Sequence, residues 1–140
     1  MRLLVRLNLL FVAVLVLHSA DHVVRQHRHT PGELGFVGLA GLAGALVSLG
    51  LALRRHARAP LAAATVGLLS AVGFLAVHLA PHWSPVSDPY PGLGLDAVSW
   101  ASMLAGVAAG LALGVAGARE LVAGGGGGGA VRLREPARQG

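Results

Sequence analysis

Long apolar runs alternate with short polar stretches along the chain, and this alternation predicts its fold. Four of the runs are long enough to cross a bilayer, for which an α-helix needs about 20 residues. They cover approximately residues 3–24, 33–53, 61–80 and 95–118. Backbone N–H and C=O groups find no water in lipid and must bond within the segment, so each run is predicted to be a helix. The pattern therefore predicts an all-α fold, a four-helix transmembrane bundle with short loops.

Helix-breaking and helix-capping residues mark the ends of these runs. The stretch TPGE (residues 30–33) places threonine, proline and glutamate in the order of a capping box, which predicts the start of the second helix. Pro60 opens the third run and Pro81 closes it. After the fourth run, six consecutive glycines lead into an arginine-rich end. We therefore predict a membrane domain over residues 1–120, followed by a glycine-rich linker and a basic, disordered tail over residues 121–140.

Composition agrees with a membrane protein. Of the residues, 54% are hydrophobic and only 12% are charged, about half the charged fraction of a soluble domain. The formal net charge of +5 comes from arginine, because the chain has no lysine. In a soluble protein this basicity would indicate nucleic acid binding. Here the arginines flank apolar runs, so the lipid bilayer is the expected partner and nucleic acid is not. The absence of cysteine excludes disulfides and thiolate metal sites.

The distribution of arginines predicts how the helices cross the membrane, because the side richer in basic residues is usually cytoplasmic. One side carries nine arginines, which are Arg2, Arg6, Arg54, Arg55, Arg58, Arg119, Arg132, Arg134 and Arg138. The other side carries Arg25 and Arg28. We therefore predict a multi-pass protein of the cell's inner (cytoplasmic) membrane with both termini cytoplasmic. Trp83, Tyr90 and Trp100 then fall at the outer face, as an aromatic belt would.

Two stretches with histidines four residues apart, HSADH and HLAPH, interrupt the apolar pattern. His18 and His22 share one helical face, with Asp21 to one side, and His78 and His82 have the same spacing. In the predicted topology the first and third helices both run outward. His18 then lies ~22 Å along the first helix and His78 ~26 Å along the third. The candidate metal ligands His18, Asp21, His22, His78 and His82 are therefore expected at one depth, near the outer face.

Imidazole and carboxylate ligands together suit Zn, Cu, Fe or Ni, and three or four of them make a site. A haem held by one histidine from each helix fits the same residues. Further candidates nearby are His27, His29, Asp88 and Asp96. The alternative is that Asp21 pairs with Arg25, four residues on, and that the histidines lie among lipid headgroups without a ligand. Polar groups in membrane segments usually face the bundle interior, which favours a site.

An enzyme is a further hypothesis, acting on a lipid or quinone at the outer leaflet with the same histidines. Membrane di-iron hydroxylases and desaturases use histidine boxes of this general form, but they need a larger ligand set, usually on the cytoplasmic side. No HExxH or GxSxG motif is present, so the sequence carries no specific enzyme signature. Transport is disfavoured, because the second to fourth runs hold no charged residue in the membrane apart from His78.

Glycines recur along two of the predicted helices. They are Gly35, Gly38, Gly41 and Gly44 in the second, and Gly106, Gly110 and Gly114 in the fourth. Small residues let transmembrane helices approach closely. Packing within the bundle is the simpler interpretation. The alternative is a structural or partner-binding subunit, in which one glycine face contacts a second copy or a partner membrane protein.

The first run is also open to interpretation as a signal peptide. Residues 1–20 have a basic start and an apolar core, with Ala20 before a possible cleavage bond. His18 would stand three residues before that bond, where a small residue is required. Cleavage would remove His18 and leave three helices.

Overall fold

The computed structural model describes residues 1–26 and 32–125, and among them it contains helices and no strand. The helices are α1 (Arg2–Ala20), the π-helical turn η1 (Asp21–Arg25), α2 (Gly32–Leu53), α3 (Ala59–His78) and α4 (Ala97–Gly125). The predicted all-α, four-helix architecture is confirmed. All four long helices, with η1 continuing the first, are long and apolar enough to cross a membrane. This is the architecture of a multi-pass membrane protein.

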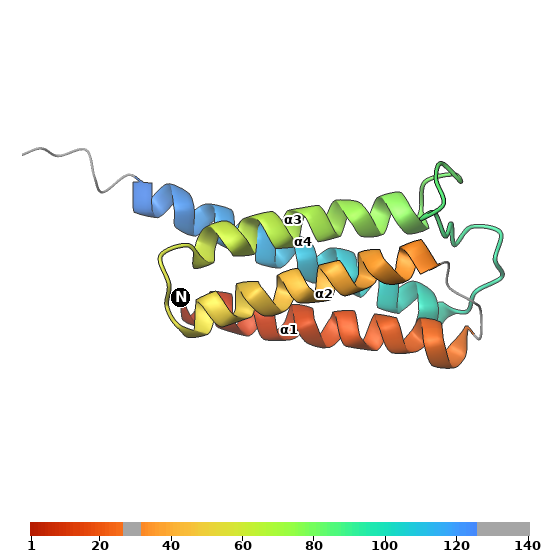
Figure 1. Cartoon of the computed structure of the whole chain (residues 1–140), viewed down its shortest axis with the longest axis horizontal. Helices are drawn as coiled ribbons and strands as arrows, with labels where there is room; N and C mark the ends of the chain where they lie inside the picture. Colours follow the sequence, from red (N-terminus) through yellow and green to blue (C-terminus); the bar gives the residue numbers. More distant parts are fainter. Residues whose placement is uncertain (27–31, 126–140) are drawn as a thin grey trace, which may run out of the picture.

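Consecutive helices of the bundle run in opposite directions (Figure 1). α1 and α3 therefore run the same way, and their C-terminal ends lie together at the end of the bundle opposite Met1. α4 returns toward the N-terminus, where the amino group of Met1 lies 2.8 Å from Glu120 Oε1. The topology thus brings His18 at the end of α1 and His78 at the end of α3 to the same end of the molecule.

The helix bounds agree with the sequence pattern, with two differences. α3 includes Pro60 in its first turn, as predicted, but it ends at His78. α4 continues past residue 118 to Gly125, because residues 119–123 (RELVA) are compatible with a helix and the first glycine comes at 124. Thr30 of the predicted capping box and residues 126–140 of the predicted tail lie outside the described residues.

Glycines bring α3 and α4 into backbone contact. A Cβ atom on Gly67 of α3 would lie 2.4 Å from the Gly114 nitrogen and 2.5 Å from the Gly110 oxygen of α4. On Gly106 a Cβ would lie 2.6 Å from the Phe74 ring. The glycine face of α4 is therefore a packing surface inside the bundle. On α2 the situation differs, because Cβ atoms on Gly35, Gly38 and Gly41 would meet nothing within 4 Å.

Candidate metal site

Three histidines meet at the end of the bundle, from two helices that are far apart in sequence. His18 lies in the last turn of α1, His22 in η1 and His78 at the end of α3. One ring nitrogen from each can be chosen so that all three lie within 4.8 Å of one another. The ring centroids are 4.7 Å apart for His18 and His22 and 5.2 Å apart for His18 and His78. His18 and His78 are buried, and the His22 side chain is 13% exposed.

Hydrogen bonds fix which nitrogen of His18 carries its proton. The Ser102 hydroxyl donates to the Ser99 carbonyl oxygen at 3.0 Å, so its oxygen is left to accept from a neighbour. His18 Nδ1 lies 3.3 Å from that oxygen and is therefore the donor. A neutral imidazole with its proton on Nδ1 carries its lone pair on Nε2. The Nε2 lone pair of His18 lies on the side of His22, 3.2 Å from His22 Nε2.

The same reasoning applies to His78. His78 Nδ1 lies 3.2 Å from the Asp88 carbonyl oxygen, which can only accept, so Nδ1 donates. His22 Nδ1 faces the Asp88 carboxylate, with 3.9 Å between Nδ1 and Oδ2. His18 and His78 therefore carry their lone pairs on Nε2, whereas the 3.9 Å contact of His22 Nδ1 is too long for a hydrogen bond and does not fix the tautomer of that ring.

The loop between α3 and α4 supplies the carbonyl oxygen and the carboxylate of Asp88, and its Tyr90 covers the site. Two main-chain bonds hold it on the end of α3, from Asp88 N to the Val77 oxygen at 2.9 Å and from Tyr90 N to the His78 oxygen at 2.8 Å. The Tyr90 ring is buried, with its centroid 4.5 Å from that of His78. Its hydroxyl oxygen lies 3.4 Å from His22 Nε2. The loop thus places one phenol beside the histidine cluster.

A set of polar contacts links η1 to α4 beside the cluster. Asp21 is buried, forms an ion pair with Arg25 (Nε to Oδ1, 3.1 Å) and accepts a hydrogen bond from Gln26 Nε2 at 2.9 Å. Arg25 also pairs with Asp96, which precedes α4. Asp96 accepts from Ser99 N–H at 3.0 Å, and this bond, followed by the charge of Arg25, holds the pKa of Asp96 below its ordinary value. Asp96 therefore acts as an N-terminal cap of α4 and as an anchor for Arg25.

The structure brings together three of the five candidate ligands, His18, His22 and His78. Asp21 lies outside this group, because its carboxylate bonds Arg25 and Gln26, as in the alternative derived from the sequence. His82 is exposed beyond the end of α3 and also lies outside the group, since the helix stops before Pro81. The further candidates His27 and His29 lie outside the described residues. Asp88 faces His22, whereas Asp96 pairs with Arg25.

Three residues around the cluster were not predicted from the sequence as part of it. Tyr90 was assigned to an aromatic belt, Ser102 was one serine among several in the membrane, and Gln26 carried no signal. Gln26 Nε2 lies 3.2 Å from the Tyr90 hydroxyl and 2.9 Å from Asp21, so it joins the loop to η1. Only Ser102 had a usable signal, as a serine near the outer end of a membrane helix, where polar groups tend to face the interior.

Comparison with known proteins adds no identity. No family model, characterised protein or solved structure matches this chain. The function must therefore be argued from the geometry of the histidine cluster.

Proposed function

We propose that this membrane protein binds a transition metal ion through the Nε2 atoms of His18, His22 and His78. The observation that carries the proposal is the orientation of the three rings. In each of them Nδ1 faces an oxygen atom, and in His18 and His78 the hydrogen bond at Nδ1 leaves on Nε2 the lone pair that a metal requires. Metal-binding histidines almost always direct their second nitrogen to a carboxylate, a carbonyl or another such acceptor, which fixes the tautomer and the ring orientation.

The nitrogen spacing supports a shared cation. His18 Nε2 and His22 Nε2 are 3.2 Å apart. With Zn–N bonds of about 2.0–2.1 Å and tetrahedral angles, two nitrogens on one Zn²⁺ stand about 3.3 Å apart. Without a metal, a proton on His22 Nε2 can join the two nitrogens in a hydrogen bond, and a cation bound between them would take the place of that proton.

The surroundings favour a single ion over a haem. A haem iron takes its two axial histidines from opposite faces of the porphyrin. Here the rings of His18 and His22 come from successive turns of one helix and lie edge to face, 4.7 Å apart. His22 and His78 stack at 5.5 Å. No porphyrin fits between rings in such contact.

Three imidazoles suit Zn²⁺, Cu²⁺, Ni²⁺ and Fe²⁺, and a tetrahedral ion needs a fourth ligand. The Tyr90 hydroxyl, 3.4 Å from His22 Nε2, lies at a spacing suited to that position, as would a water molecule. Zn²⁺ is our first choice, because its four-coordinate geometry agrees with the nitrogen spacing. In the predicted topology the ion would be taken up from the outer side, and the described helices show no row of ionisable residues leading to the other side.

The alternative of a partner-binding subunit loses one of its two glycine faces. α3 covers Gly106, Gly110 and Gly114 of α4 within the bundle, whereas the α2 face with Gly35, Gly38 and Gly41 is open and stays available to a partner.

The test is Zn²⁺ binding to full-length protein, purified in mild detergent and treated with a chelator. We expect near-stoichiometric Zn²⁺ by elemental analysis and a rise in unfolding temperature. At a free Zn²⁺ concentration 100 times Kd, binding adds about 2.7 kcal/mol of stability. The double variant His18→Ala/His78→Ala should lose both effects. His82→Ala is the matched control, because His82 belongs to the second histidine pair but is exposed.

Two results would contradict the proposal. One is a wild-type protein that stays metal-free and shows no thermal shift with Zn²⁺, Cu²⁺, Ni²⁺ or Fe²⁺. The other is equal Zn²⁺ binding by the wild type and a correctly folded double variant, which would put the metal elsewhere.

A further inference from the structure

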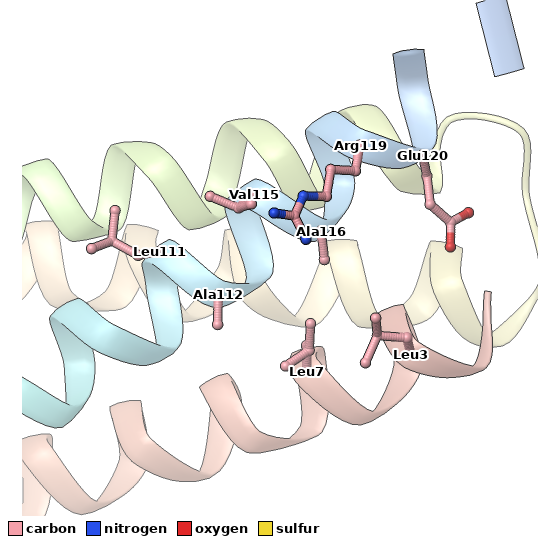
Figure 2. A pocket seen from close by; sticks show the side chains of 8 residues that line it. All are labelled: Leu3, Leu7, Leu111, Ala112, Val115, Ala116, Arg119 and Glu120. Atoms are coloured by element: carbon pink, nitrogen blue, oxygen red, sulfur yellow. The ribbon is translucent and has the colours of Figure 1, made fainter. Parts of the chain in front are cut away.

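A groove of about 450 Å³ lies between α1 and α4, at the end of the bundle opposite the histidines (Figure 2). Its lining residues are Leu3, Leu7, Leu111, Ala112, Val115, Ala116, Arg119 and Glu120. Six of these are apolar, and two charged residues stand together at one end. The groove therefore has an apolar length and a polar mouth.

The apolar part of the groove suits one hydrocarbon chain. Ala112 and Ala116 are four residues apart on α4, so these two small side chains leave space beside Leu111 and Val115. Leu3 and Leu7 of α1 form the facing wall. From residue 111 to residue 119, α4 rises about 12 Å. Half of a ~30 Å hydrocarbon core has nearly this depth, so the groove spans about one leaflet.

Charge at the mouth favours an anionic group. The Glu120 carboxylate is matched by the amino group of Met1 at 2.8 Å. Arg119 has no ion-pair partner in the part of the chain that the structure describes. Figure 2 shows its side chain folded back along α4 toward the apolar part of the lining. A guanidinium in this position can bond two phosphate oxygens at once.

We propose that this groove binds an anionic phospholipid of the leaflet on the arginine-rich side. One acyl chain lies along Ala112 and Ala116, and Arg119 holds the phosphate of the headgroup. A headgroup with net negative charge is preferred, because a zwitterionic one would bring its own cation to the same mouth. A second copy of this chain is the less suitable occupant, since a symmetric contact would bring two Arg119 side chains together.

The proposal is tested by native mass spectrometry of the full-length protein in mild detergent. Phosphatidylglycerol and phosphatidylcholine with identical acyl chains are added at equal concentrations. We expect retention of phosphatidylglycerol over phosphatidylcholine, and a loss of about fivefold in that retention for Arg119→Gln. Arg54→Gln is the matched control, because Arg54 is exposed at the same end of the bundle and outside the groove.

A second variant separates groove binding from general attraction of lipid. Ala112→Phe fills the groove and should lower phosphatidylglycerol retention with Arg119 still present. Val47→Phe adds the same ring to an exposed position on α2 and should change nothing. Equal retention of both lipids, no effect of Arg119→Gln, or equal retention by the two phenylalanine variants would overturn the proposal. So would a dimer of the protein that excludes lipid and dissociates in Ala112→Phe.

Discussion

At the end of the bundle that holds His18 and His78, polar side chains are buried and bond to one another. At the other end, the basic residues Arg2, Arg54 and Arg119 are exposed, and one ion pair joins Met1 to Glu120. Both ends carry basic side chains, mainly histidines at the first end and arginines at the second. The two ends differ in whether these side chains meet one another inside the bundle. Side chains that meet inside the bundle can build a site for a small cation, whereas exposed side chains at the interface set topology and meet lipid.

The largest expected effect comes from separating α3 from α4, which would disrupt both ends at once. In Gly67→Leu the new side chain meets the backbone of Gly110 and Gly114, which cannot move aside without parting the helices. We expect a loss of about 3 kcal/mol or more in unfolding free energy, measured by circular dichroism in mild detergent. Gly38→Leu is the control, since its Cβ meets nothing within 4 Å. Equal unfolding temperatures for the two variants would refute this account of the packing between α3 and α4.

The next largest effect is confined to the histidine end. His78→Ala removes the one proposed ligand that α3 contributes. The Zn²⁺ affinity should fall more than about 100-fold, beyond the usual effect of losing a residue that only supports a ligand. Competition with a chromophoric chelator measures this change. His56→Ala, an exposed histidine in the connection between α2 and α3, should bind as the wild type does. If His78→Ala also kept wild-type affinity, His78 would not be a ligand.

A smaller effect is expected where a residue orients a ligand without touching the metal. Ser102→Ala removes the acceptor for His18 Nδ1. The Zn²⁺ affinity should drop about 10-fold, because the tautomer and ring orientation of His18 are then less fixed. Ser102→Thr retains the hydroxyl and should restore most of the affinity, which a purely steric role would not explain. Ser70→Ala on α3 controls for loss of a serine in the membrane.

The smallest effect belongs to the arginine end. Glu120→Gln breaks the ion pair with the amino group of Met1. The side chains of Met1 and Glu120 are both about one third exposed. Such pairs contribute about 1 kcal/mol or less, so the unfolding temperature should change little and Zn²⁺ affinity should not change. Thermal unfolding at low and high salt checks this, since salt should remove what difference there is. A large loss of stability would show that this end is also a cooperative network.

The fold could be predicted almost entirely from the sequence, because lipid permits few structures for a long apolar run. The helix ends that differ have local causes. α3 stops at His78, before Pro81, and α4 runs on through residues 119–123, where no helix breaker stands. Helix length and the alternation of direction were then enough to place His18 and His78 at one end.

The site could be predicted only for residues within helices or at their ends, because their positions follow from the helical period. It placed His18, His22 and His78 correctly in the same region, because all three lie on or at the ends of membrane helices. It placed Tyr90 only at the outer face and Asp88 only near the cluster, without their contacts, since a proline-rich loop has no period and folds back through main-chain bonds. Spacing alone also paired His82 with His78, although the helix ends before His82. Whether the cluster holds a metal stays a prediction.

The π-helical turn η1 also determines how this region would respond to a change in chain length. A π turn holds one residue more than an α turn, so deleting Val23 or Val24 can be absorbed by a switch to α-helix. The preceding residues, His18 on α1 and His22 at the start of η1, would keep their places. Because the extra residue of the π turn is the one removed, Arg25 and Gln26 would also stay in register and keep their contacts with Asp96 and Tyr90. A single-codon deletion at this point would thus be tolerated better than one inside α1, where every residue after the deletion would rotate by about 100° around the helix axis.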